Sequence, residues 1–232
     1  MMSPSLTSEQ LDAFRRLDAC LLSNAIEKFH ERLRNQGFVH DRVHCLTPHP
    51  HSMVGYAATI KIRGSEPPTT AGIYPDRTDW WDYILSLPAP RVLVIQDTES
   101  RSGLGALIGR VHINILRALD CVGVLTDGSV RDLPVAQSLG FYLFAASVSV
   151  SHAFVHIVDI GHPVEVGGLK IQSGELLHGD MHGVQSVPLA IVPRVLEVAA
   201  RIDAWKRELI ALCQSPDFSL EKLRAVITRE RS

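Results

Sequence analysis

The sequence lacks the features that mark several specialised classes of protein. No uninterrupted apolar run reaches about 18 residues, which excludes a membrane-spanning helix. The 23 Lys and Arg residues against 25 Asp and Glu give a formal net charge of -2, so no basic nucleic-acid-binding or membrane-binding surface is expected. The cysteines form no C-x-x-C pair, which argues against a zinc ribbon or a disulfide framework: Cys20, Cys45, Cys121 and Cys213.

Targeting and nucleotide-binding motifs are missing as well. The first ten residues are polar and contain no apolar core of a secretion signal, so we expect a cytoplasmic protein. The chain has neither G-x-G-x-x-G nor the P-loop pattern, which excludes the common nucleotide fingerprints. With 232 residues, of which 46% are hydrophobic, the chain is long enough to bury a real core, and we expect one domain over residues 1–232.

The middle of the chain predicts a βαβ unit. Residues 92–95 read Val-Leu-Val-Ile, the pattern of a strand buried on both faces. After the glycine-containing loop 97–105, we expect a helix to begin near Ala106 and to run to Asp120. A second apolar strand begins at Val122, so the two strands should lie parallel and adjacent. A glycine-containing loop ahead of a helix N-terminus is a ready anion-binding site.

The pair Arg131 and Asp132 follows the second strand, after an Asp-Gly turn signal. A guanidinium matches a carboxylate, and an Asp carboxylate is a hard ligand for Mg²⁺ or Mn²⁺. On spacing alone, a solvated surface ion pair is the more common explanation. Ligands of α/β proteins nevertheless collect at the carboxyl ends of parallel strands, where this pair and the glycine-containing loop are both expected. Position therefore favours a carboxylate-and-metal site.

Helices are predicted on both sides of a β-rich segment. Near the N-terminus, Ser23 or Asn24 is expected to cap a second helix. Residues 148–187 alternate short β-rich runs with glycines, which predicts an antiparallel meander. Residues 193–213 predict a long amphipathic helix, and 219–230 a shorter charged one.

Two groups of histidines do not form a convincing ligand pattern. His152 and His156 do not share a strand face with His162 in any register that the sequence fixes, so we expect them to be structural. His178, Asp180 and His182 alternate as metal ligands would, but the glycines beside them predict a hairpin turn instead.

The glycines and the Arg-Asp pair belong to one spaced pattern: Gly109, Gly123-Val124, Asp127-Gly128 and Arg131-Asp132. This pattern resembles the signature of the RraA-like family. The family includes the ribonuclease-activity regulator RraA and the class II pyruvate aldolases that cleave 4-hydroxy-4-methyl-2-oxoglutarate and also decarboxylate oxaloacetate. The resemblance covers roughly residues 17–212 and leaves 213–232 as a helical tail. It implies an α/β fold, a swivelling β/β/α domain with N-terminal helices and a long C-terminal helix, assembled as homotrimers or homohexamers with sites between protomers.

The resemblance also implies a role for each site residue. Arg131 would bind the carboxylate of the pyruvate unit, and Asp132 would bind Mg²⁺ or Mn²⁺, partly through water. The backbone amides of Gly105, Ala106 and Leu107 would hold the same carboxylate or the carbonyl. The implied activity is that of a divalent-metal-dependent lyase, which cleaves or decarboxylates a small 2-oxo acid through a metal-stabilised enolate.

One position departs from the aldolase pattern. Aldolase members carry Asp or Glu immediately after the spaced glycine, and this chain has Arg110. A cation there would repel a metal-bound water, and would instead bind another substrate carboxylate or pair with Glu99 or Asp132. An acid of the C-terminal helix, Asp203 or Glu208, is then the candidate to complete the metal shell across the interface.

The alternative function is that of a non-catalytic RraA-type regulator that binds a protein partner. The retained Asp132 favours the lyase, because the regulator type tends to lose this residue. Arg110 favours the regulator.

Overall fold

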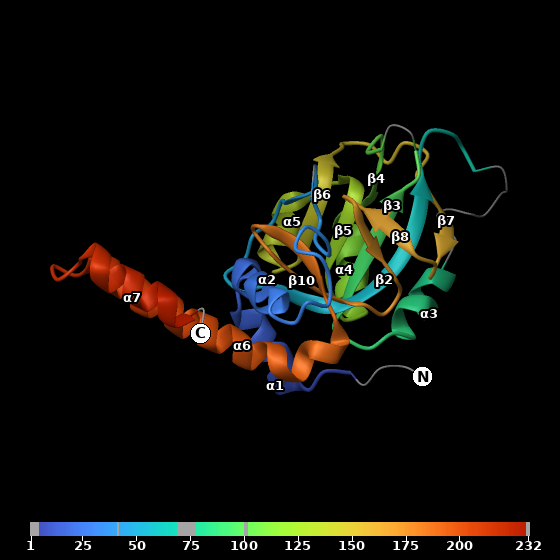
Figure 1. The fold of residues 1–232 in the computed structure, drawn as a ribbon. Coiled ribbons are helices and arrows are strands. Elements are labelled where there is room, and N and C mark those ends of the chain that lie inside the picture. Colours follow the sequence, from blue (N-terminus) through green and yellow to red (C-terminus); the bar gives the residue numbers. More distant parts are fainter. Residues whose placement is uncertain (1–4, 41, 69–77, 100–101, 231–232) are drawn as a thin grey trace.

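The structure, a computed structural model, describes residues 5–40, 42–68, 78–99 and 102–230. Within these ranges nine strands form one sheet, whose centre is parallel (Figure 1). The parallel strands lie in the order β6-β5-β3-β2: β6 (Tyr142–Val148), β5 (Cys121–Val130), β3 (Arg91–Asp97) and β2 (Met53–Arg63). The predicted adjacent and parallel pairing of the two buried strands, β3 and β5, is confirmed. The short strand β1 (His44–Cys45) extends the sheet beyond β6.

The long strand β2 organises the second half of the chain. It has 11 residues, and it pairs with β3 along one edge. Its other edge pairs near one end with β10 (Leu176–Asp180) and near the other with β7 (His156–Ile160). The sheet then ends in β11 (Gly183–Val187), while β8 (Val164–Val166) and β9 (Leu169–Ile171) form a separate two-stranded ladder. The predicted short antiparallel strands of residues 148–187 are confirmed, and β8–β9 and β10–β11 pair as successive neighbours. Their arrangement as one continuous meander is wrong, because β7 and β10 both pair with β2, which is distant in sequence.

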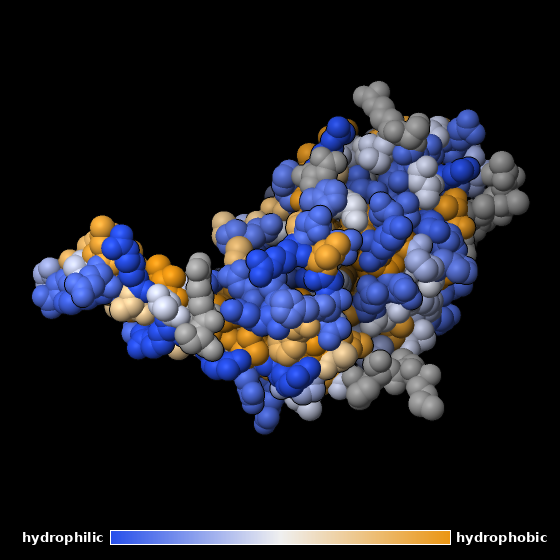
Figure 2. All heavy atoms as spheres, viewed as in Figure 1, coloured by the Kyte–Doolittle hydropathy of each residue, from blue (hydrophilic) through white to orange (hydrophobic). Residues whose placement is uncertain are grey.

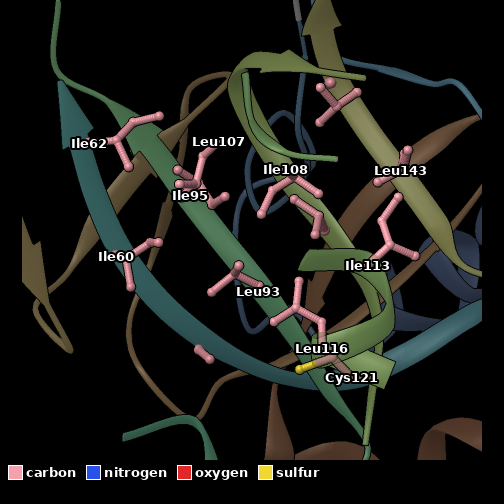
Figure 3. Packing of buried hydrophobic residues seen from close by; sticks show 14 of the residues in the cluster. Ile60, Ile62, Leu93, Ile95, Leu107, Ile108, Ile113, Leu116, Cys121 and Leu143 are labelled. Carbon is pink, nitrogen blue, oxygen red and sulfur yellow. The ribbon is translucent and has the colours of Figure 1, made fainter. Parts of the chain in front are cut away.

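Helices cover the sheet in two groups. The first group packs with the largest core cluster, which Figure 3 shows between the strands and α4: α3 (Asp79–Leu85), α4 (Arg110–Ala118) and α5 (Leu133–Ser138). The second group packs around a separate cluster with β2 and β10: α1 (Ser8–Arg16), α2 (Ala19–Glu27) and the first half of α6 (Val192–Gln214). The α/β class, the N-terminal helices and the long C-terminal helix are as predicted.

The start of α4 differs from the prediction. Ala106, Leu107 and Ile108 are all buried and form a strand, β4 (Ala106–Ile108), which pairs in parallel with β5. The helix begins only at Arg110, after Gly109. Three consecutive buried residues suit a strand that is covered on both faces better than the first turn of a half-exposed helix. The expected helix N-terminus therefore lies four residues later in the chain.

The second helix also begins elsewhere than predicted. α2 begins at Ala19, and its N-cap is Asp18, whose side chain accepts a hydrogen bond from Leu21 N–H at 2.7 Å. Ser23 and Asn24 lie inside the helix, so the expectation that either would cap it is wrong. An Asp at this position stabilises the helix start because its carboxylate satisfies a free N–H.

The C-terminal helices project from the body of the molecule as an arm (Figure 1). The buried residues of α6 lie in its first half, up to Ile202. Beyond that point α6 packs against α7 (Leu220–Glu230), through Trp205 Nε1 donating to Val226 O at 3.4 Å among other contacts. Hydrophobic residues are exposed along this arm (Figure 2): Ile210, Phe218 and Leu220. The described ranges contain no helix whose length and hydrophobicity would let it span a lipid bilayer.

Candidate functional site

The predicted Arg-Asp pair lies in a cavity of about 530 Å³ at the N-terminus of α4. Arg131, Asp132 and Arg110 all line this cavity, although Arg110 is 21 residues from Arg131 in sequence. Two histidines, His112 and His152, complete its polar lining. The structure therefore brings together the three charged residues that the sequence singled out.

Asp132 connects the end of β5 to the start of α4. Its Oδ2 accepts a hydrogen bond from the backbone N–H of Arg110 at 2.6 Å. The backbone of Asp132 is left-handed, with φ 59° and ψ 38°, and its side chain makes no cap to its own helix, α5. Asp is one of the few residues that tolerate this conformation, which turns the carboxylate toward the positive end of α4.

Arg131 is fixed by its backbone and by a neighbouring loop. Its N–H donates to Ile108 O at 3.0 Å, which joins it to the end of β4. Its guanidinium donates through Nη1 to Val150 O at 3.3 Å and through Nη2 to His152 Nε2. Among the described residues, its Nε is buried without a hydrogen-bond partner.

Gly109 is the point where these groups meet. A methyl group added at its Cα would lie 2.7 Å from Arg131 Nε and 2.9 Å from Asp132 Oδ2. Its φ of -142° is open to any residue, so the requirement for glycine is steric rather than conformational. The first glycine of the sequence pattern thus makes room for the Arg-Asp pair.

The residues Gly105, Ala106 and Leu107 occupy a different place from the one expected. The N–H of Ala106 donates to Ser151 O at 2.9 Å, and the carbonyl of Ala106 is bonded by His152 Nδ1 at 2.7 Å. Ala106 and Leu107 lie in β4 instead of in a turn at a helix N-terminus, and none of the three belongs to the described residues that line the cavity. The helix N-terminus at the cavity is instead that of α4, where Arg110 N–H donates to Asp132 Oδ2 and the intrahelical bonding begins with Ile113 N–H to Gly109 O.

The sequence of the chain matches the family model described as "RraA-like: Aldolase/RraA" over residues 17–185. The chain belongs to the RraA-like family. A protein from Halalkalibacterium halodurans, provisionally named a 4-hydroxy-4-methyl-2-oxoglutarate aldolase, is 28% identical over 100 residues. Those residues are 43% of this chain and 48% of that protein, so the match spans about half the length of the relative.

Solved structures share the RraA-like fold over almost the whole chain. A crystal structure of a protein from Pseudomonas syringae pv. tomato str. DC3000 has a TM-score of 0.74 at 22% identity and covers 97% of both chains. Streptomyces coelicolor RraAS2, described as an unusual member of the RNase ES inhibitor RraA protein family, has a TM-score of 0.68 at 17% identity. That match covers 88% of this chain and 97% of RraAS2. At these identities the likeness shows the fold alone.

The pairing options predicted for Arg110 are partly wrong. Glu99 does not pair with it: its Oε1 accepts hydrogen bonds from Gly64 N–H at 3.2 Å and from Ser65 Oγ at 2.7 Å. These hydrogen bonds, that of Ser65 first, lower the pKa of Glu99. Arg110 reaches Asp132 only through its main-chain N–H among the described contacts, and its side chain is exposed at the cavity.

Sequence reasoning missed the two histidines of the RraA-like site. His152 was expected to be structural, yet it lines the cavity and contacts Arg131. His112 lies in the first turn of α4, and burial is the main cause that lowers its pKa, with the positive charge of Arg131 acting in the same direction. Neither has a local sequence signal, because both reach the cavity through tertiary packing. The expected turn at residues 180–182 is confirmed, with His182 N–H donating to Asp180 Oδ1 at 2.8 Å.

The side chains of the cavity fit a divalent cation only if water supplies most of its ligands. Across the described ranges, no three His, Cys, Asp or Glu side chains gather as a metal-binding group. In the cavity, Asp132 is the lining carboxylate, and one of its oxygens already accepts the Arg110 N–H. Mg²⁺ is commonly held by one or two carboxylates with waters and substrate oxygens completing its shell, which is compatible with this geometry.

The two acids of the C-terminal helix have partners within the arm. Asp203 pairs with Arg207 at 2.6 Å, and Glu208 pairs with Arg229 of α7. Neither lines the cavity of its own chain, so their suggested part in a metal shell stays a prediction about a neighbouring protomer.

The Asp-Gly of the signature serves the sheet rather than the cavity. Asp127 Oδ1 accepts Asp97 N–H at 2.8 Å, and Asp97 Oδ2 accepts Gly103 N–H at 2.7 Å. These bonds tie Gly103 and the end of β3 to Asp127 of β5. Burial, opposed by the hydrogen bonds and reinforced by the charge of Asp97, raises the pKa of Asp127 to about 6.

Asp127→Asn is expected to remove part of the pH dependence of stability. A carboxyl whose folded pKa lies above its unfolded value, about 3.9, stabilises the fold at low pH, and this contribution is lost as pH rises through about 6. The amide oxygen of Asn would still accept the Asp97 N–H. A folded pKa of about 6 against an unfolded value of about 3.9 corresponds to about 3 kcal/mol, and solvent screening of the partly exposed carboxyl reduces this. Urea unfolding should therefore show the variant to be roughly 1 to 2 kcal/mol more stable than the wild type at pH 8. At pH 4 the two should be equal.

The exposed Asp12→Asn is the control for that measurement, because Asp12 pairs with Arg15 at the surface of α1. A stability difference between Asp127→Asn and the wild type that stays constant from pH 4 to pH 8 would contradict the role of the buried carboxyl.

Gly109→Ala is expected to damage the site while leaving the fold intact. The added methyl group displaces Arg131 or Asp132, and we expect calorimetric titration to show at least about tenfold weaker binding of oxalate, a planar mimic of a pyruvate enolate. Gly128→Ala is the matched control, since its methyl group meets nothing nearer than Thr126 Oγ1 at 3.2 Å. Equal oxalate affinity of Gly109→Ala and the wild type would show that the glycine does not shape the binding site.

Proposed function

We propose that the protein is a divalent-metal-dependent lyase that cleaves or decarboxylates a small 2-oxo acid and releases pyruvate. The reaction is of the 4-hydroxy-4-methyl-2-oxoglutarate aldolase or oxaloacetate decarboxylase type. The observation that carries the proposal is the shared cavity of Arg131 and Asp132 at the N-terminus of α4. Membership of a family that is described as Aldolase/RraA supports it.

Arg131 is suited to bind the carboxylate of the 2-oxo acid. Its guanidinium is half-buried, which strengthens a charge-assisted hydrogen bond relative to one in water. The first-turn amides of α4 line the same cavity and favour negative charge. Binding at these groups places the 2-oxo carbon beside Asp132.

Asp132 is the residue that would hold Mg²⁺ or Mn²⁺. A bound divalent ion supplies Lewis-acid stabilisation of the enolate oxygen that forms when the C–C bond breaks. The hydrogen bond from Arg110 N–H to Oδ2 orients the carboxylate of Asp132, so that Oδ1 is the oxygen available to other ligands. The chain's own contribution is thus the orientation of one carboxylate in a cavity that otherwise carries positive charge.

Arg110 favours a substrate with a second carboxylate that survives the reaction. In aldol cleavage of a 4-carboxy substrate, the distal carboxylate stays charged in the product. In decarboxylation of oxaloacetate it becomes neutral CO₂, so a cation beside it stabilises the ground state more than the transition state. Arg110 therefore supports aldol cleavage of a dicarboxylate more than decarboxylation.

The same proposal includes a cytoplasmic homotrimer or homohexamer with sites between protomers, and no nucleic-acid or membrane partner. The projecting arm with its exposed apolar side chains supports an assembly of several copies. The second candidate is a non-catalytic RraA-type regulator that binds a protein partner. The cation at position 110 favours this candidate.

The decisive experiment is an oxaloacetate assay with Mg²⁺ or Mn²⁺, repeated with chelator. We expect metal-stimulated pyruvate release that falls at least about 100-fold in Asp132→Asn, because the amide keeps the Arg110 N–H bond but loses the metal-binding charge. Asp12→Asn should behave as the wild type. If the wild-type protein turns over no 2-oxo acid in the presence of metal, the regulator is the correct assignment.

Arg110→Gln tests the role of the residue that departs from the aldolase pattern. We expect kcat/KM for aldol cleavage of a 4-carboxy-2-oxo acid to fall by about tenfold, while oxaloacetate decarboxylation stays equal or rises. Arg117→Gln, at the exposed far end of the same helix, is the control. Higher aldolase activity in Arg110→Gln or Arg110→Glu would mean that the cation limits the reaction instead of binding substrate.

A further inference from the structure

The loop between β6 and β7 is firmly seated against β4. Ser151 O accepts the N–H of Ala106 at 2.9 Å, and Ala153 takes a left-handed conformation with φ 46°. A methyl group at Gly105 would lie 2.2 Å from His152 O, so the two segments are in close backbone contact. A loop held in this way presents the His152 ring in one orientation.

The hydrogen bonds of His152 fix the state of its ring. Nδ1 lies 2.7 Å from the carbonyl oxygen of Ala106, which can only accept, so Nδ1 carries the proton. Nε2 of the neutral ring is then an acceptor, and it faces Nη2 of Arg131, which can only donate. The chain of donors and acceptors runs in one direction from Arg131 through His152 to the strand β4.

This chain restricts the guanidinium of Arg131. One terminal nitrogen is held by His152 and the other by Val150 O at 3.3 Å. A free Arg side chain loses much rotamer entropy when it binds a carboxylate, and a held one has lost it already. Arg131 is therefore oriented before any ligand arrives.

We propose that His152 is a positioning residue, which orients the Arg131 guanidinium for a carboxylate ligand. The inference rests on the proposed function only in that Arg131 binds a carboxylate. It assigns no contact between His152 and the substrate, and it requires no turnover.

The test is calorimetric binding of oxalate in the presence of Mg²⁺, with KM and kcat measured where the wild type turns over. His152→Leu should weaken oxalate binding by about tenfold and raise KM more than it lowers kcat. His152→Gln should restore most of the affinity, because its Oε1 can accept from Arg131. His162→Leu, a largely exposed histidine paired with Asp159, is the control.

A double-mutant cycle separates this role from simple packing. In an Arg131→Ala background, His152→Leu should cause no further loss of oxalate affinity, because its effect acts through Arg131. Additive losses, an unchanged affinity in the folded His152→Leu protein, or a failure of His152→Gln to restore binding would each overturn the proposal. If the binding series holds and no metal-stimulated turnover is found, the lyase assignment fails and the positioning role stands.

Discussion

The hydrogen bond between Asp132 Oδ2 and the N–H of Arg110 is the contact on which the site depends. It joins the end of β5 to the start of α4 across the position of Gly109, where no side chain fits. The bond requires a left-handed backbone at Asp132, a conformation that costs free energy in most residues. The helix N-terminus offsets part of that cost by stabilising the carboxylate. The left-handed backbone of Asp132, the lack of space for a side chain at Gly109 and the dipole of α4 therefore all act at this one contact.

Tertiary structure completes the cavity with segments that are far apart in the chain. β4 inserts beside β5 and carries Ile108, whose carbonyl holds the N–H of Arg131. The loop after β6 contacts β4 and positions His152 at the cavity. Because β5 lies between β3 and β6 in the sheet, the segments that follow these strands meet at one edge. The cavity is a consequence of this strand order together with the inserted strand.

Local sequence patterns predicted those helices and strands whose structure is determined by their own residues. The run Val92–Ile95 is buried on both faces and could only be a central strand, and the apolar periodicity of α6 predicted its length to within a residue at each end. Residues 106–108 could not be assigned in this way, because three apolar residues before a helix suit a strand or a first turn equally. Their pairing with β5 decides the matter, and that pairing is non-local.

The same limit applied within the signature. The spacing of Asp127, Arg131 and Asp132 suggests one functional unit, yet Asp127 bonds the backbone of β3 while the other two face the cavity. No residue between them gives a sequence signal for this difference in role. His152 was missed for the related reason that its partner, the carbonyl of Ala106, lies 46 residues away.

The charge balance of the cavity decides what it can accept. Arg110 and Arg131 oppose a single lining carboxylate, Asp132, so the cavity attracts anions more strongly than cations. A divalent ion would then bind most favourably together with a carboxylate ligand, whose charge offsets the two guanidinium groups. Burial and the neighbouring positive charge of Arg131 lower the pKa of His112, which disfavours a further positive charge on this ring. The charges of the cavity are thus arranged to attract an anionic ligand. In the proposed function, Arg110 would recognise that ligand at the position where the resemblance to aldolase members predicts an acid.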